Sequence, residues 1–248
     1  MDRLIWTAVS GMADSMVRQR VIASNMANAQ TTGFRAETLW SQPVTLKGPQ
    51  LEARAMTQGQ VRGANMRAGA IVQTGRNLDV AMTGNALLAL QAADGTEAYT
   101  RRGDLSVSPT GVLQNGDGRP VIGNGGPITL PLGSEASIAP DGTVLIANPD
   151  APDAPPQAVD RIKLVSPAGS RIEKGLDGLF RVQGGPDTAL PADENARVVT
   201  ASLEQSNVDS SEVLVEMISA QRLFDIRTKL IATAREIDER GSSLMRLS

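Results

Sequence analysis

The side chains that most often carry out catalysis or bind metals are scarce in this sequence. Its 248 residues include no histidine and no cysteine, which excludes imidazole acid/base catalysis, thiol nucleophiles and zinc sites built from imidazole or thiolate. Asp193 and Glu194 are a candidate carboxylate pair of the glycosidase kind, but they are adjacent and follow Pro191 in a predicted loop. We therefore predict that the protein is not an enzyme and has no cofactor and no metal site.

Two glycine-rich stretches resemble fragments of ligand-binding loops. The sequence GNGGP at 123–127 lacks both the Gly-Lys-Ser/Thr of a phosphate loop and a GxGxxG spacing. The sequence NGDG at 115–118 lacks the later ligands and the bidentate glutamate of a calcium loop. Tight turns are the favoured interpretation of both stretches, because these residue types supply the backbone conformations that turns require.

Tyr99, Arg101 and Arg102 form a third candidate, an anion site on an alternating strand. A lone tyrosine on such a strand is more often a packing residue, so we favour that interpretation. The formal net charge of −3 and the pI of about 5.2 provide no basic surface for a phosphate backbone. We expect no nucleic acid and no small-molecule substrate among the partners.

The N-terminal segment has the pattern of an amphipathic helix. Proline is absent from residues 4–28, and Thr31, Thr32 and Gly33 favour a turn after them. Apolar residues recur there at alternating steps of four and three: Ile5, Val9, Met12, Met16, Ala23 and Met26. The charged residues Asp14, Arg18 and Arg20 interrupt this segment, so we expect no cleaved signal peptide and no membrane insertion.

The C-terminal segment predicts a longer helix with two apolar faces. Asp209 is the expected N-cap, with Glu212 in the capping-box position, and the helix is expected over 210–240 with Gly241 fraying or kinking its end. One face carries Leu223, Ile226, Leu230 and Ile237, and an adjoining face carries Met217, Phe224 and Ile231. If the two terminal helices pair, we expect the second face to stay exposed until other copies cover it.

The middle of the chain has the turn signals of antiparallel β-structure. Asp-Gly or Asn-Gly pairs recur beside short β-prone runs, and residues 106–113 and 137–145 share a Ser-aliphatic-x-Pro-x-Gly pattern that predicts the same turn in two hairpins. Because only 2% of residues are aromatic, the core is expected to be aliphatic. Residues 41–75 have weak periodicity and are predicted to be an extended connector or a loose hairpin.

These patterns together predict an α+β fold. Residues 1–40 and 200–248 are expected to form a paired terminal helical domain, into which an antiparallel β-rich domain of residues 76–199 is inserted. Two long helices make a thin module with an apolar face left over, and polymerisation would cover that face.

Two long segments resemble the signatures of the flagellar rod and hook protein family. Residues 21–36, VIASNMANAQTTGFRA, carry an Asn-x-x-Asn pair followed by Thr-x-Gly-Phe. Residues 206–230, SNVDSSEVLVEMISAQRLFDIRTKL, are similar to the C-terminal motif of that family. Residues 74–90 and 98–113 also resemble stretches of rod proteins, so the resemblance extends over most of the chain.

The resemblance implies a structural subunit of the bacterial flagellar basal-body rod that functions in motility. The terminal helices would form a coiled-coil-like inner domain, copies would stack helically around a central export channel to transmit torque, and the β-domain would lie outside. The subunit would pass through the flagellar type III export apparatus without a cleaved signal peptide and assemble in the periplasm with itself and other rod proteins.

The expected assembly interface follows from the apolar stripes and the two signatures. It comprises Ile5, Val9, Met12, Met16, Asn25, Met26, Asn28, Phe34, Asn207, Met217, Gln221, Leu223, Phe224, Leu230, Ile231 and Ile237. For Asn25 and Asn28 two roles remain open, namely hydrogen bonds across subunits or satisfaction of a local turn.

Within the rod, the resemblance implies the proximal position. Three alternatives to a proximal rod subunit remain at this point. The first is a distal rod or other axial subunit of the same family. The second is a glycan-binding or peptidoglycan-cleaving module, against which the six aromatic residues argue because such a module needs an aromatic platform or facing carboxylates. The third is a free-standing binder whose terminal helices fold into a bundle.

Overall fold

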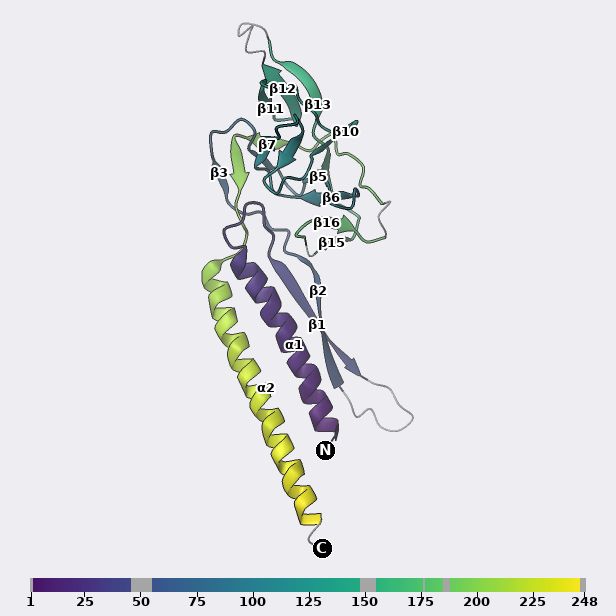
Figure 1. Cartoon of the computed structure of the whole chain (residues 1–248), viewed down its shortest axis with the longest axis vertical. Helices are drawn as coiled ribbons and strands as arrows, with labels where there is room; N and C mark the ends of the chain where they lie inside the picture. The colour runs from purple at the N-terminus through teal and green to yellow at the C-terminus, as the bar shows by residue number, and fades with distance from the viewer. Residues whose placement is uncertain (1, 46–54, 148–154, 176, 185–187, 246–248) are drawn as a thin grey trace. The chain divides into compact units, whose positions relative to one another are not determined.

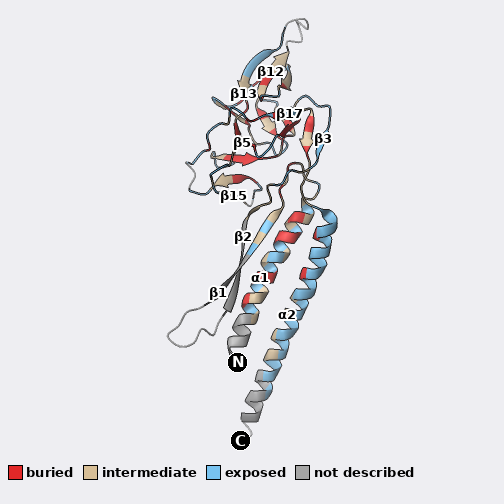
Figure 2. Cartoon of the chain, turned by 180° about the vertical axis from the view of Figure 1, so that it is seen from behind, coloured by how far each residue is buried: buried red, intermediate tan, exposed pale blue. Residues whose placement is uncertain are grey.

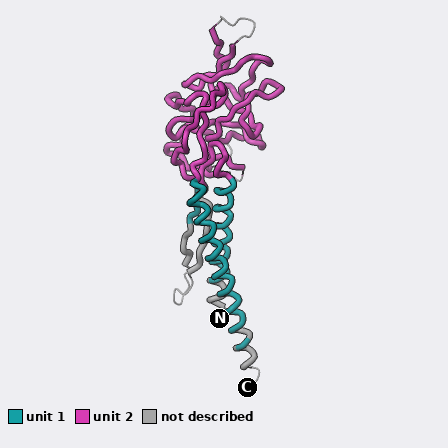
Figure 3. Tube along the Cα trace, turned by 90° about the vertical axis from the view of Figure 1, so that its left-hand side faces the viewer, with its two compact units in different colours: residues 1–27, 37–63, 209–248 teal, residues 28–36, 64–208 magenta. Residues whose placement is uncertain are grey.

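The chain forms two compact units, each with its own elements (Figure 3). The structure, a computed structural model, describes residues 2–45, 55–147, 155–175, 177–184 and 188–245. Unit 1 consists of residues 1–27, 37–63 and 209–248, and unit 2 consists of residues 28–36 and 64–208. Long helices together with antiparallel strands make the fold α+β, as predicted.

Unit 1 contains two long helices that lie side by side (Figure 1). Helix α1 spans Asp2–Ala27 and helix α2 spans Ser210–Met245. Strands β1 (Glu37–Thr45) and β2 (Ala55–Ala64) pair in a two-stranded sheet, and β1 packs against α1. Residues 41–75, predicted as a connector or loose hairpin, thus include parts of a strand pair, with 46–54 outside the described residues.

The start of α2 has the cap that its sequence predicts. One carboxylate oxygen of Asp209 accepts hydrogen bonds from the backbone N–H groups of Ser211, at 2.8 Å, and Glu212, at 3.2 Å. These N–H groups have no acceptor within the helix, so the cap satisfies two of the donors that a helix start leaves open. The helix continues through Gly241 to Met245, past the predicted end at residue 240.

Helices α1 and α2 are joined by a polar contact in their interface. The Arg227 guanidinium donates hydrogen bonds to the backbone carbonyl of Gly11 and the hydroxyl of Ser15 on α1. Its Nη1 also lies 3.9 Å from the carboxylate of Asp14. Since Ser15 and Asp14 are buried, this arginine gives their polar groups a partner inside the helix pair.

The face of α2 that meets α1 differs from the predicted one. Phe224 and Ile231 are half-buried on the α1 side, whereas Ile226, Leu230 and Ile237 are more than half exposed. The prediction that Phe224 and Ile231 stay exposed while the Leu223–Ile237 stripe pairs was therefore wrong. The face that meets α1 also contains Ala220 and Arg227, which share the heptad spacing of Phe224. Because one of these residues is charged and the other is small, the sequence does not mark this face as the apolar one.

Unit 2 is built from short strands, and every pairing among its described strands is antiparallel, as predicted. A five-stranded sheet has the order β14-β5-β6-β16-β15, and a three-stranded sheet has the order β11-β12-β13. Two-stranded pairs are β17-β4, β18-β3, β7-β8 and β10-β9. The bounds are β3 Ile71–Gln73, β4 Val80–Met82, β5 Leu87–Gln91, β6 Glu97–Thr100, β7 Leu105–Val107, β8 Leu113–Asn115, β9 Ile122–Gly123, β10 Gly126–Pro127, β11 Glu135–Ile138, β12 Thr143–Ala147, β13 Gln157–Arg161, β14 Leu164–Val165, β15 Ile172–Lys174, β16 Phe180–Val182, β17 Val198–Thr200 and β18 Ser202–Glu204.

Strand β5 lies between two hydrophobic clusters of unit 2. Its residues Leu88 and Leu90 belong to the larger cluster, and Leu87 and Ala89 belong to the smaller one. Successive side chains of a strand point to opposite faces, so a strand covered on both faces is apolar at every position. The larger cluster contains no aromatic residue among its buried members, as the composition predicts.

The turns of unit 2 follow the predicted chemistry. In the β7–β8 hairpin Gly111 N–H donates to the Ser108 carbonyl at 2.9 Å, and in the β11–β12 hairpin Gly142 N–H donates to the Ala139 carbonyl at 2.9 Å. Both glycines have positive φ, at 84° and 88°. The two similar sequence stretches therefore form the same turn. Residues 115–118 form a turn as well, and residues 124–125 are the turn between β9 and β10.

Candidate functional site

An exposed apolar stripe runs along α2 in unit 1. Ile226, Leu230 and Ile237 are 57%, 55% and 53% exposed, and Leu223 is 37% exposed. Most of α2 is coloured as exposed in Figure 2. Leu223, Ile226 and Leu230 lie three or four residues apart in the chain. The next position with this spacing is the polar Thr233, and Ile237 follows it. Exposed apolar rows of this kind are typical of interaction surfaces in proteins.

Two grooves run between α1 and α2. One, of about 430 Å³, is lined by Gln19, Ile22, Ala23, Met217, Ala220, Gln221, Phe224 and Asp225. The other, of about 850 Å³, is lined by Val9, Met12, Thr228, Lys229, Ile231, Ala232, Thr233, Arg235 and Glu236. Their walls hold six of the predicted interface residues. They combine apolar side chains such as Phe224 and Ile231 with charged ones such as Asp225.

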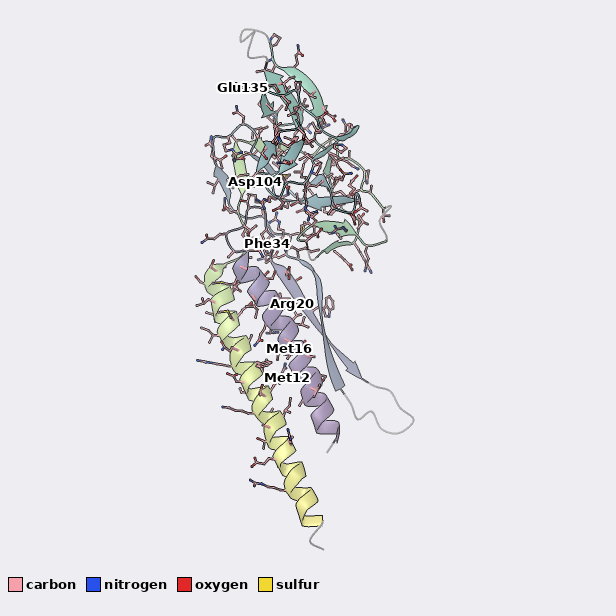
Figure 4. All side chains as sticks on the ribbon, in the orientation of Figure 1. Met12, Met16, Arg20, Phe34, Asp104 and Glu135 are labelled. Atoms are coloured by element: carbon pink, nitrogen blue, oxygen red, sulfur yellow. The ribbon has the colours of Figure 1, made fainter. Side chains whose placement is uncertain are left out.

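The predicted residues of α1 do not share one environment. Val9 and Met16 are exposed, and Met12 and Met26 are half-buried. Figure 4 shows Met12 and Met16 on α1. The side chain of Ile5 lies outside the described residues. The exposed members leave α1 with apolar surface in addition to that on α2.

Asn25, near the end of α1, holds the beginning of β1. Its side-chain oxygen accepts the Glu37 backbone N–H at 2.7 Å, and its side-chain N–H donates to the Glu37 carbonyl at 3.0 Å. The amide thus pairs with one residue as a neighbouring strand would. Ser24 donates to the Glu37 carboxylate at 3.1 Å. These amide bonds of Asn25 lie within one chain.

Asn28 and Thr31 close a local turn in unit 2. The Thr31 hydroxyl donates to the side-chain oxygen of Asn28 at 3.1 Å, and the Thr31 N–H donates to the Asn28 carbonyl at 3.1 Å. The bonds of Asn28 match the local-turn role that the sequence left open, whereas those of Asn25 reach the backbone of Glu37 in β1. Phe34, six residues on, is half-buried, and the Lys174 ammonium lies 3.4 Å from the centre of its ring.

Glu204, the last residue of β18, is the centre of a buried ion cluster in unit 2. Its carboxylate lies 2.8 Å from Arg101 Nε, 2.5 Å from Arg101 Nη2 and 2.7 Å from Arg35 Nη2. The backbone N–H of Gly69 donates to the same carboxylate at 2.8 Å. All three charged side chains are 1% exposed. We call Arg35, Gly69, Arg101 and Glu204 the Glu204 junction.

The two arginines of the Glu204 junction also donate hydrogen bonds to backbone carbonyls. Arg101 donates to Met82, Gly84 and Ala86 at 2.9, 2.9 and 2.5 Å, and Arg35 donates to Arg67. Within the described residues, Arg35 Nε has no hydrogen-bond partner. Burial lowers the pKa of Arg35, and the charge of Arg101 acts in the same direction while Glu204 opposes it.

The predicted anion candidate does not have free donors. Arg101 is occupied in the Glu204 junction, and Arg102 pairs with Asp104 at 2.7 Å and with Asp117 at 2.5 Å. The hydroxyl of Tyr99 donates to Glu97 at 2.8 Å and accepts the Leu190 N–H at 2.6 Å. Tyr99 is buried, which raises its pKa above the ordinary value, so packing is its role.

Sequence reasoning missed the Glu204 junction. The strand sequence Ser202-Leu203-Glu204 places Leu203 alone on one face, which predicts the two polar residues outside. The structure has the reverse pattern, with Ser202 and Glu204 buried and Leu203 half-exposed. No local pattern could have indicated this, because the arginines that neutralise Glu204 lie about 100 or more positions away in the chain.

The described residues offer little for chemistry of other kinds. Among them no group of three or more acidic side chains is placed to hold a metal ion. In the described part of the chain, neither helix is both long enough and apolar enough to cross a membrane.

Three segments match models of flagellar protein families. Residues 5–35 match the model described as flagella basal body rod protein, which contains most of the first signature. Residues 81–146 match the flagellar hook protein FlgE/F/G D1 domain. Residues 199–244 match the flagellar basal body rod FlgEFG protein C-terminal model, which begins before the Glu204 junction residue and extends along α2.

Several full-length relatives carry the same description. The flagellar basal-body rod protein FlgF of Salmonella typhimurium is 40% identical over 252 residues, covering 100% of both chains. FlgF of Escherichia coli K12 is 39% identical with the same coverage. FlgG of Bacillus subtilis is 31% identical over 259 residues, covering 96% of this chain and 97% of that protein. The chain therefore belongs to the flagellar basal-body rod protein family, as a structural subunit and not an enzyme.

Proposed function

We propose that this rod subunit polymerises helically around a central export channel, with its terminal helices forming the inner, coiled-coil-like layer and residues 76–199 the outer one. The observation that carries the proposal is the exposed stripe of Ile226, Leu230 and Ile237 on α2. A subunit with such a stripe gains stability when a neighbour removes it from water, at roughly 25 cal/mol per Å² of apolar surface.

The type of contact follows from two different surfaces of unit 1. The stripe lies on the exposed face of α2, whereas the grooves lie between α1 and α2. A contact between two different surfaces of the same molecule is heterologous, and it produces a helical filament when the rotation does not close. Stacked helices of this kind make an axle that transmits torque.

The position proposed for the subunit is the proximal rod. Identity to the two FlgF relatives, at 40% and 39%, exceeds that to FlgG of Bacillus subtilis, at 31%. A distal rod position is the second candidate, because that FlgG protein is also similar along nearly its whole length. The export route of the proposal is the flagellar type III apparatus, without a cleaved signal peptide, into the periplasm.

The experiment tests the α2 stripe in the host cell. A strain lacking the native gene receives the chain with Ile226→Asp and Leu230→Asp, and isolated basal bodies are imaged and analysed for this subunit. We expect the variant to be absent from the rod and the cells to be non-motile. Ser210→Asp with Ser211→Asp places the same two charges at exposed polar positions of α2 outside the stripe and both grooves, and this variant should assemble. Normal rods with the double variant would contradict the proposal.

A further inference from the structure

The chain passes between the two units at four places, and three segments of unit 2 lie next to these crossings. The crossings follow residues 27, 36, 63 and 208. The segments beside them are 28–36, 64–69 and 204–208. Any force that the helices of unit 1 exert on unit 2 through the covalent chain enters through these three segments.

Backbone hydrogen bonds connect segment 28–36 to each of the other two segments. Asn65 N–H donates to the Ala36 carbonyl at 2.8 Å, and Gly33 N–H donates to the Glu204 carbonyl at 2.7 Å. Asn207 N–H donates to the Phe34 carbonyl at 3.3 Å. The three segments therefore form one bonded group and are not separate tethers.

Asn207 adds a side-chain link to both partner segments. Its side-chain oxygen accepts the Ala36 N–H at 2.8 Å. Its side-chain N–H donates to the Asn65 carbonyl at 2.7 Å and the Arg67 carbonyl at 2.8 Å. One amide thus binds 28–36 and 64–69 at once, and its own residue belongs to 204–208.

The Glu204 junction fixes this group to the sheet of unit 2. Glu204 bonds Arg35 of the first segment and Gly69 of the second, and it also bonds Arg101, which directly follows β6 and holds three backbone carbonyls between residues 82 and 86. Pulling Glu204 out would leave two buried arginines without their counter-ion, which is costly.

Two glycines let the backbones come this close. A Cβ on Gly33, whose φ is 67°, would collide with the backbone of Arg101 and Arg102. A Cβ on Gly69 would collide with the carbonyl of Gln205. The segments are in direct backbone contact, so none of them can shift alone.

We propose that the Glu204 junction and Asn207 together are a mechanical clamp. A force applied to the N-terminal segment 28–36 or to the C-terminal segment 204–208 is then carried by the core of unit 2 as a whole. Its use in the rod rests on the proposed transmission of torque. Without the clamp, the C-terminal segment would be held by β18 and β17, which are three residues each and would open one hydrogen bond at a time.

Single-molecule pulling on the isolated full-length chain tests the clamp. The chain has no cysteine, so introduced cysteines are unique attachment points. Three variants are used, and each combines Glu135→Cys with a second exposed cysteine. Ser211→Cys applies force to the C-terminal segment, and Ala27→Cys applies it to the N-terminal segment. Ala93→Cys applies force within unit 2 alone. In the otherwise native chain we expect unit 2 to unfold in one step in all three geometries.

Glu204→Gln should create a separate unfolding step only where the clamp carries the load. When Ser211 is pulled, we expect residues 198–208 to detach first, in a separate low-force step of roughly 40 Å. With the Ala93 pair, unit 2 should still unfold in one step, and its unfolding force should fall by less than the force with the Ser211 pair. Glu173→Gln makes the same chemical change at an exposed position of unit 2 and should not alter any geometry.

Two outcomes would overturn the clamp. One is an equal loss of force in all three geometries, which would mean that Glu204 only stabilises unit 2. The other is one-step unfolding of Glu204→Gln from Ser211 at the native force. If Glu204→Gln does not fold, Asn207→Ala, which retains the ion cluster, is pulled under the same criteria. The experiment requires no rod, so its failure leaves the proposed assembly intact, and failed assembly leaves the clamp intact.

Discussion

The carboxylate of Glu204 accepts two contacts from Arg101, at 2.8 Å from Nε and 2.5 Å from Nη2, although 103 positions separate the residues in the chain. Both contacts reach the same carboxylate oxygen, Oε2, and the charge on both groups makes them stronger than hydrogen bonds between neutral groups. The pairing joins the end of β18, just before the C-terminal signature, to Arg101, which follows β6. The other carboxylate oxygen, Oε1, reaches Arg35, which lies within the N-terminal signature.

Glu204→Gln should destabilise unit 2 strongly. The substitution keeps the shape of the side chain but removes the negative charge between two buried arginines, and breaking a buried pair in this way typically costs about 3–5 kcal/mol. The free energy of unfolding from denaturant titration measures the loss. Glu173→Gln, at an exposed site, should change it by less than about 0.5 kcal/mol, and equal effects of the two variants would contradict the account.

Gly33→Ala should cost more than Gly75→Ala. Both glycines have positive φ, at 67° and 77°, so an alanine at either site pays the left-handed penalty of roughly 1–2 kcal/mol. A Cβ at Gly75 meets open space, whereas one at Gly33 collides with the backbone of Arg101. The collision should add roughly 1–3 kcal/mol, as overpacking does. Thermal unfolding of the two variants measures the difference, and equal melting temperatures would show that the contact at Gly33 yields freely.

Asn25→Ala should release the start of β1 from α1. The variant loses both hydrogen bonds to the Glu37 backbone, and leaving these buried groups unsatisfied costs about 1–3 kcal/mol. Amide hydrogen exchange at Glu37 should become faster. Asn124→Ala, at an exposed turn of unit 2, is the control and should leave that exchange rate unchanged. An unaltered rate in Asn25→Ala would mean that the amide does not hold β1.

Asp177 should contribute to the loss of unfolding free energy of unit 2 at acidic pH. Hydrogen bonds from Arg181, reinforced by the backbone N–H of Leu179, hold the pKa of Asp177 below its ordinary value of 3.8. Because the folded pKa is lower than the unfolded one, this stabilisation is complete above pH 3.8 and is lost as the pH falls through the folded pKa. Asp177→Asn should reduce the decline of unfolding free energy below pH 3.8. A slope identical to that of the native chain would refute this assignment.

Local structure was the part of the fold that the sequence could predict. The cap at Asp209 and the turns at Gly111 and Gly142 depend on residues within a few positions of one another, so their patterns are complete in the sequence. The antiparallel class of the strands follows from the same turns. These predictions were confirmed.

Long-range choices could not be predicted in the same way. Which face of α2 meets α1 depends on Arg227 finding acceptors at Gly11 and Ser15, over 200 positions away. The burial of Glu204 depends on Arg35 and Arg101 arriving from other parts of the chain. Apolarity alone favours the stripe of Leu230 as the pairing face and Leu203 as the inward residue, and it was wrong for both.

The measurement that tests the central claim most directly is site-specific photo-cross-linking in cells with assembled basal bodies. A photoreactive amino acid replaces Leu230 in the α2 stripe, and in a parallel chain it replaces Thr110, an exposed residue of the β7–β8 turn in unit 2. The account predicts that Leu230 cross-links to a second copy or another rod protein in basal bodies and not in the dilute purified chain. Basal bodies that contain the subunit but show no cross-link from Leu230 would contradict assembly through the exposed face of α2.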